Sequence, residues 1–227
     1  MFCYASRTGT GRNLAALRAH GWGLLVSRAG VWRTEGFERW GSDNGAWADF
    51  QAGRSFDEDA YEHFLDWVGA QPVHPDWIVL PDIVAGGLPS LRLSMRYLNR
   101  CLSLAPLVLI AVQDGMETTD LAALVGTAVG VFLGGSTEWK LATMRAWGEF
   151  CAERGIHYHV ARVNSTKRMN LAASCGTQSV DGSSVSRYAV TCPKLTSASR
   201  QADLWSPRRV VDNGIVHPPL QSDGAET

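Results

Sequence analysis

Residues 129–153 read VGVFLGGSTEWKLATMRAWGEFCAE. The stretch begins with an apolar run, Val129 to Leu133, whose length suits a buried strand. Two glycines then make a turn, and Ser136 stands directly before a long segment with apolar residues at helical spacing, which is the position of a helix N-cap. The stretch therefore predicts one strand, one turn and one helix, the repeating unit of a parallel α/β sheet.

Short apolar runs and longer amphipathic segments alternate along the rest of the chain in the same way. The clearest other helix is expected at Asp57 to Val68, and a further helix N-cap at Thr118 or Thr119. The other expected strands are Phe2 to Ala5, Gly23 to Ser27, the weaker Arg39 to Ser42, Trp77 to Leu80, Leu107 to Val112, His157 to Arg162 and Ser179 to Asp181. Eight such units predict a compact (β/α)8 barrel of the α/β class, with some helices short or missing because the chain is small for this fold.

Length and composition predict one domain. The chain has 227 residues, of which 45% are hydrophobic, so it can bury one sizeable core. We expect residues 1–204 to form the barrel and residues 205–227, rich in proline, glycine and polar residues, to form a loosely ordered tail. The sequence has no apolar run long enough for a membrane span and no signal peptide at its start, which predicts a cytoplasmic protein with no membrane partner. Its five scattered cysteines are expected to be buried thiols.

Charge is unevenly distributed along the chain although the formal net charge is only -1. Residues 35–82 are strongly acidic, and basic residues predominate from residue 154 to residue 209. The C-terminal third could therefore face the phosphates of a nucleic acid. The alternative is that these charges only solvate the outer faces of helices. The basic residues that we expect near flanking phosphates are Arg162, Lys167 and Arg168, together with Arg187.

Polar residues follow the expected strands at the point where each strand ends. In a β/α barrel these ends meet at one open mouth, where the reacting groups lie. An aspartate after a strand is most often only a turn or cap residue, but several converging on one mouth need donors or basic groups to balance them. The residues at these positions are Asp43, Asp82, Gln113, Asp114, Gly134, Gly135 and Asp181.

Five short motifs, in chain order and each at a strand end, resemble those of the tRNA-guanine transglycosylases. They are SDNGAW (42–47), LPD (80–82), AVQDG (111–115), FLGG (132–135) and VDGSSVSR (180–187). The resemblance covers most of the chain. It implies a barrel enzyme that exchanges a guanine-type base in nucleic acid through a covalent bond to an aspartate.

The resemblance also implies a role for each matching residue. Asp181 would be the nucleophile and Asp43 the general acid and base. The aromatic residues that could receive an extruded base are Trp47, Trp139 and Tyr158. The residues that would bind the substrate are Asp82, Gln113, Gly134, Gly135, Asn44 and Arg187.

The chain departs from the family at three places. The zinc-binding cysteine motif is absent and no room remains for its subdomain, Lys140 stands where the family has an acidic residue, and Gly182 replaces a cysteine. A smaller barrel without zinc resembles the DNA-acting branch, the phage and genomic-island enzymes that place 7-deazaguanine derivatives into DNA. This predicts no metal or other cofactor, a 7-deazaguanine base as co-substrate, and DNA rather than RNA as the polymer. Whether the active form is a homodimer stays open.

Two other classes of function remain. His157 and His159 are two residues apart on an expected strand, so both side chains point to one face and could bind a metal, as in a metal-dependent hydrolase with Asp82 or Asp181 as further ligands. The other class is a non-catalytic nucleic-acid-binding module that keeps the barrel and its base pocket but relies on another subunit for catalysis.

Overall fold

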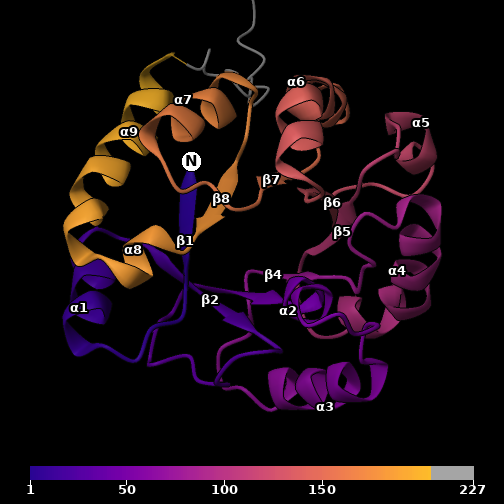
Figure 1. Ribbon diagram of the computed structural model, residues 1–227, viewed down its shortest axis with the longest axis horizontal. Helices are drawn as coiled ribbons and strands as arrows, with labels where there is room; N and C mark the ends of the chain where they lie inside the picture. Colours follow the sequence, from indigo (N-terminus) through magenta and orange to yellow (C-terminus); the bar gives the residue numbers. More distant parts are fainter. Residues whose placement is uncertain (206–227) are drawn as a thin grey trace, which may run out of the picture.

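The computed structural model describes residues 1–205, and in it eight parallel strands close into a barrel in chain order, with β1 paired to β8 (Figure 1). The strands are β1 (Phe2–Ser6), β2 (Gly23–Ser27), β3 (Trp40–Asp43), β4 (Trp77–Val79), β5 (Val108–Val112), β6 (Val129–Leu133), β7 (Tyr158–Val160) and β8 (Ser179–Gly182). The predicted (β/α)8 barrel is confirmed. Of the expected tail at 205–227, residues 206–227 lie outside the described residues.

Helices surround the barrel (Figure 1). They are α1 (Gly11–Ala19), α2 (Ala46–Gln51), α3 (Glu58–Gly69), α4 (Gly87–Leu102), α5 (Thr118–Leu121), α6 (Thr137–Arg154), α7 (Thr166–Ser174), α8 (Ser184–Arg187), the 3-10 helix η1 (Ala189–Thr191) and α9 (Cys192–Trp205). Ser136 caps α6 as predicted, accepting a hydrogen bond from the Trp139 N–H. The start of α5 differs from the prediction, because Glu117 is its N-cap and exchanges capping hydrogen bonds with Asp120.

The connection from β2 to β3, residues 28–39, contains no helix. An aromatic cluster covers the outside of the barrel there instead. The ring of Trp32 lies 5.3 Å from that of Phe64 and 6.1 Å from that of Trp67, both on α3, and Trp67 also contacts Trp40 of β3. This explains how the weakly predicted third strand is buried without a helix of its own.

Large side chains fill the barrel interior opposite glycines. Tyr4, Trp77 and Leu109 belong to a core cluster that is separate from the one between strands and helices. A Cβ atom at Gly41 would lie 2.4 Å from the Trp77 ring, and one at Gly23 would lie 2.7 Å from the Tyr4 ring. Glycine is required at both positions because the facing ring takes the space of a side chain. Side chains of this cluster therefore fill the space between the strands.

None of the helices within residues 1–205 combines the length and the apolar character that crossing a membrane needs.

Candidate active site

A pocket of about 350 Å³ opens at the carboxyl ends of the strands. This volume is within the range of about 300–1,000 Å³ typical of ligand sites. The two predicted catalytic residues and the predicted substrate-binding residues all line this pocket, and so does Arg162. The set is Asp43, Asn44, Asp82, Gln113, Gly134, Gly135, Arg162, Asp181 and Arg187. The barrel therefore brings together residues up to 144 positions apart in the chain, from Asp43 to Arg187.

Asp181 of β8 lies at the pocket with its carboxylate held from two sides. Its Oδ1 accepts a hydrogen bond from the backbone N–H of Arg162 at 3.1 Å, and its Oδ2 lies 3.0 Å from His159 Nε2. Asp181 is buried, at 6% exposure. The next position allows only glycine, because a Cβ at residue 182 would lie 2.6 Å from the Val163 carbonyl oxygen. The two contacts to its oxygens orient the Asp181 carboxylate.

Asp43 ends β3 on the other side of the same pocket. Its Oδ2 accepts a hydrogen bond from the Gly45 N–H at 3.3 Å. Burial raises the pKa of the Asp43 carboxyl, and the negative charge of Asp181 raises it further, against hydrogen bonds from Ser27 and Gly45 that lower it. A carboxyl group in this setting can hold a proton and give it up to a ligand.

The side-chain amides of Asn44 and Gln113 hold the Asp82 carboxylate at the pocket by hydrogen bonds. Asn44 Nδ2 donates to Asp82 Oδ1 and Gln113 Nε2 donates to Asp82 Oδ2, both at 2.6 Å. Gln113 Oε1 in turn accepts from the backbone N–H groups of Ala85, at 3.2 Å, and Gly135, at 3.1 Å. Because its oxygen is already engaged twice, Gln113 offers a ligand only a donor, whereas Asp82 offers acceptors.

We expect Asp82 to make the folded state less stable as the pH rises from about 4 to 7. Burial, and after it the nearby Asp43, raise the pKa of Asp82 to about 7 from 3.8, although the Asn44 hydrogen bond lowers it. The folded chain then holds a proton that the unfolded chain has released, so the free energy of unfolding falls by up to on the order of 4 kcal/mol across this range. Urea denaturation of the wild type and Asp82→Asn at each pH checks this, and parallel pH profiles for the two proteins would contradict it.

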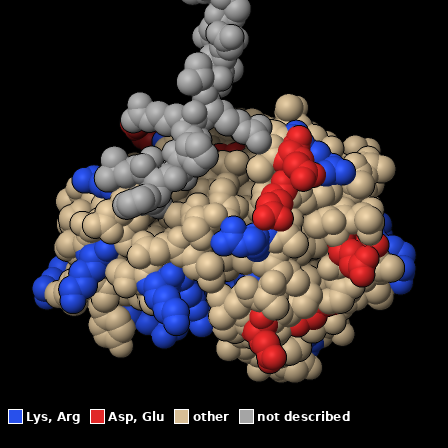
Figure 2. Space-filling model, turned by 90° about the horizontal axis from the view of Figure 1, so that it is seen from above, with Lys and Arg blue, Asp and Glu red and all other residues tan. Residues whose placement is uncertain are grey.

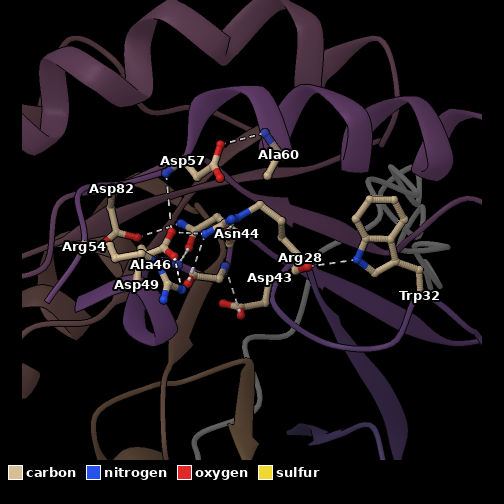
Figure 3. Close-up of polar contacts among 11 residues, drawn as sticks. Arg28, Trp32, Asp43, Asn44, Ala46, Asp49, Arg54, Asp57, Ala60 and Asp82 are labelled. Atoms are coloured by element: carbon tan, nitrogen blue, oxygen red, sulfur yellow. Dashed lines mark hydrogen bonds and ion pairs between the residues drawn. The ribbon is translucent and has the colours of Figure 1, made fainter. Parts of the chain in front are cut away.

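A buried ion pair supports the loop that carries Asp43 and Asn44 (Figure 3). Arg28 Nε donates to the Asn44 carbonyl oxygen at 2.7 Å, and the guanidinium pairs with Asp49 of α2. Burial alone would raise the pKa of Asp49, but hydrogen bonds from Arg54 and Arg28 outweigh it and lower the pKa. Figure 3 shows the Asp43 carboxylate outside this cluster, with a single contact drawn to it. The ion pair thus fixes the loop and leaves Asp43 available to a ligand.

We expect Arg28→Met to lower the free energy of unfolding by about 3 kcal/mol, because it removes the buried cation and leaves the buried Asp49 carboxylate with the exposed Arg54 and the Asp57 N–H as partners. Arg96→Met is the matched control. Arg96 pairs with Glu58 at the surface, where its side chain is 63% exposed, so its loss should cost less than about 1 kcal/mol. Urea denaturation of both variants measures the difference, and equal losses would refute a structural role for the buried pair.

Arg162 lies inside the pocket, beyond the rim position that the sequence suggests for a phosphate contact. Its guanidinium is 4.4 Å from the centre of the Trp47 ring and donates to the Gly135 carbonyl oxygen. Its backbone has φ 59, in the left-handed region that non-glycine residues rarely adopt. That conformation accompanies the hydrogen bond from its N–H to Asp181. Arg162 therefore shapes the pocket through both its backbone and its side chain.

Trp47 is the aromatic candidate that lines the pocket, and this residue is 41% exposed. Tyr158 is fully buried and donates its hydroxyl to the Met144 carbonyl oxygen, so it belongs to the core. Trp139 packs against that core from α6 and does not line the pocket. The Arg162 guanidinium lies over the Trp47 ring, and the Phe50 ring stacks 5.5 Å from it.

Lys167 and Arg168 lie in the first turn of α7, next to the pocket but outside its lining. Lys167 is exposed and Arg168 is half-buried. Arg187 of α8 is exposed and reaches the pocket edge. In Figure 2, the basic side chains gather on the side where α1 and α9 lie in Figure 1, and acidic ones gather on the opposite side.

Both histidines of the predicted pair contact one hydroxyl. His157 Nε2 lies 2.7 Å and His159 Nδ1 lies 2.8 Å from Ser179 Oγ. The other ring nitrogen of His159 contacts Asp181. Within residues 1–205 no group of three or more His, Cys, Asp or Glu side chains is arranged to hold a metal ion. The two histidines therefore belong to a chain of hydrogen bonds that runs through Ser179 to Asp181 in the pocket. The sequence did not predict this chain.

Lys140 is a second residue whose place the sequence did not reveal. It is 2% exposed, and its Nζ donates to the carbonyl oxygen of Ala161, a pocket residue, at 2.5 Å. Burial lowers the pKa of Lys140 to about 7, and the positive charge of Arg162 lowers it further. The burial of a lysine at this position depends on the segment after β7 that packs against α6, which the sequence around Lys140 does not show.

The chain matches no protein-family model and no curated protein. Among solved structures it is similar to a cube-shaped, highly porous protein cage designed by fusing symmetric oligomeric domains, with a TM-score of 0.52 and 12% sequence identity over 90% of this chain and 74% of that chain. At this identity the likeness concerns the fold alone, so the argument for a function rests on the geometry of the pocket.

Proposed function

We propose that this chain is a DNA-guanine transglycosylase, which exchanges guanine in DNA for a 7-deazaguanine derivative through a covalent bond between Asp181 and the sugar. The observation that carries the proposal is the presence of two unlike carboxyl groups in one pocket. Asp181 accepts two hydrogen bonds that orient its oxygens, whereas the pKa of Asp43 is raised by burial and by Asp181. This division suits a nucleophile and a proton donor.

In the first half of the exchange, a carboxylate oxygen of Asp181 bonds to the sugar C1′ as the bond from C1′ to N9 of guanine breaks. The electron pair of that bond stays with the base, and Asp43 donates its proton to guanine N7. The products are neutral guanine, an ionised Asp43 and a glycosyl ester on Asp181. Storing the sugar as an ester is the strategy of retaining glycosidases.

In the second half, N9 of the incoming 7-deazaguanine attacks C1′, the bond from C1′ to the Asp181 oxygen breaks, and Asp43 takes the N9 proton. Both carboxyl groups then return to their starting states. Because the new base has a carbon in place of N7, Asp43 cannot expel it by protonating that position. Removal of the inserted base is therefore slower than removal of guanine, and the exchange needs no external energy source.

The base-reading side of the pocket supports a guanine-type base. Asp82 offers acceptor oxygens that match the N1 and N2 donors of guanine, and Gln113 offers a donor that matches O6. The backbone of Gly134 and Gly135 lies beside Gln113 at the same wall. A base must leave its stack to reach this pocket, and Trp47 at the opening would receive it once the Arg162 guanidinium leaves the face of that ring.

The test is mass spectrometry of nucleosides from the DNA and RNA of cells that express the chain and are supplied with a 7-deazaguanine base. We expect a modified deoxynucleoside in the DNA of cells with the wild-type chain and none with Asp181→Asn. A modified ribonucleoside alone would show that RNA is the polymer and overturn the choice of DNA. The absence of any modified nucleoside would overturn the transglycosylase proposal.

A further inference from the structure

His159 lies fully buried in the barrel interior, directly beneath Asp181. It is the central residue of β7, and its two ring nitrogens contact β8 at two points: Nδ1 is 2.8 Å from Ser179 Oγ, and Nε2 is 3.0 Å from Asp181 Oδ2. Ser179 Oγ also lies 2.7 Å from His157 Nε2. The four side chains form a continuous chain of hydrogen bonds through the barrel interior to the pocket.

The ring of His159 has one fixed orientation. It stacks on Phe132 at 4.8 Å between ring centres and 5° between planes, and the Trp77 ring lies 4.7 Å away on a tilted plane. The imidazole cannot turn without displacing both aromatic rings. The direction from Nε2 to Asp181 is therefore set by packing, independently of any ligand.

The contacts also decide which nitrogen of His159 carries the proton. An ionised Asp181 only accepts hydrogen bonds, so a bare Nε2 at 3.0 Å would place two lone pairs against each other. With the proton on Nε2, Nδ1 accepts the Ser179 O–H, and Ser179 Oγ accepts the His157 N–H. His157 suits that role as a neutral ring, because burial lowers its pKa to about 4 and His159 lowers it further.

We propose that His159 is the positioning residue of the Asp181 nucleophile, an inference that rests on the proposed function. Its Nε2–H, with the Arg162 N–H on the other oxygen, orients the carboxylate toward C1′. The charge on Asp181 disappears when the ester forms and returns when the ester breaks. A hydrogen bond to a charged acceptor is stronger than one to a neutral acceptor, so His159 favours departure of the carboxylate in the second half of the exchange.

Two isosteric variants test this role. In His159→Gln the side-chain amide nitrogen reaches the place of Nε2 and still donates to Asp181, whereas in His159→Asn it reaches only the place of Nδ1, near Ser179.

Rapid-quench measurements follow ester formation on a guanine oligonucleotide and its breakdown when a 7-deazaguanine base is added. For His159→Asn we expect breakdown to slow by about 10- to 100-fold, the ester to accumulate, and base affinity to stay unchanged. His159→Gln should recover to within about 5-fold of the wild type. Equal rates for the wild type and His159→Asn, or equal losses in both variants and in both steps, would overturn the inference.

A measurement without substrate separates this inference from the proposed function. Long-range ¹H–¹⁵N spectra of ¹⁵N-histidine protein, with His159 assigned by His159→Gln, should show the Nε2–H tautomer. The Nδ1–H tautomer would overturn the positioning role whatever the activity. If the Nε2–H tautomer is found but the wild type forms no ester with any oligonucleotide, the proposed function fails and the hydrogen bond to Asp181 stands as a structural contact only.

Discussion

Asp181→Asn should form no covalent adduct with a guanine oligonucleotide, and its base exchange should fall by about 10⁴-fold or more. An amide oxygen is too poor a nucleophile and too poor a leaving group to form and break the glycosyl bond. Adduct formation is measured on denaturing gels and by intact-protein mass spectrometry. Binding of the free base should persist, because the contacts expected of Asp82 and Gln113 do not involve residue 181.

Asp66→Asn is the control for this substitution. Asp66 is an exposed carboxylate on α3 that pairs with Arg100, remote from the pocket, so its change to asparagine should leave the adduct rate unaltered. An adduct that forms with Asp181→Asn at the wild-type rate would show that another residue is the nucleophile, and peptide mapping of the adduct would then identify it.

Asp43→Asn should slow ester formation from a guanine oligonucleotide by about 10²- to 10⁴-fold, because the departing base no longer receives a proton. The structural reason is that burial and the charge of Asp181 raise the pKa of Asp43, so that a proton is available there. Single-turnover adduct formation measures the effect. The fold of the variant is checked by its free energy of unfolding.

The leaving base distinguishes lost proton donation from a distorted pocket. An oligonucleotide with 7-methylguanine already carries the positive charge that protonation of N7 would provide, so its base departs without an acid. With this substrate Asp43→Asn should approach the wild-type rate, whereas Asp181→Asn should remain inactive. If Asp43→Asn stays equally slow with both substrates, Asp43 is not the proton donor.

Most of the barrel could be predicted from hydrophobic patterning. Seven clear apolar runs and one weaker run became the eight strands, and Ser136 caps α6 where the sequence placed it. The weak third strand shows the limit of patterning. Its burial comes from Trp32 and Trp67, which lie 8 residues before and 27 residues after Trp40, and no local window contains both. The start of α5 was misplaced because Glu117 and Asp120 form the cap with each other.

Arg162 and His159 show what patterning could not decide about the pocket. A basic residue after a strand was consistent with a phosphate contact, but its guanidinium packs on Trp47, 115 residues earlier in the chain. Two histidines at a spacing of two suggested a metal site, whereas Ser179 and Asp181 on the next strand contact their ring nitrogens. In both cases the partner comes from another strand or its loop, and spacing along one strand contains no information about it.

The alternation of strands and helices, and the polar residues at the strand ends, could be read from residue order. Both properties follow from local rules, since side-chain direction alternates along a strand and parallel strands end at the same side. Only the tertiary structure decided how those polar groups interact: that Asp181 is held by His159 and Arg162, that Asp82 is held by Asn44 and Gln113, and that Asp43 is influenced by Asp181. Distances across the barrel depend on its closure and register, and the protonation of a buried carboxyl group depends on those distances and on the exclusion of water.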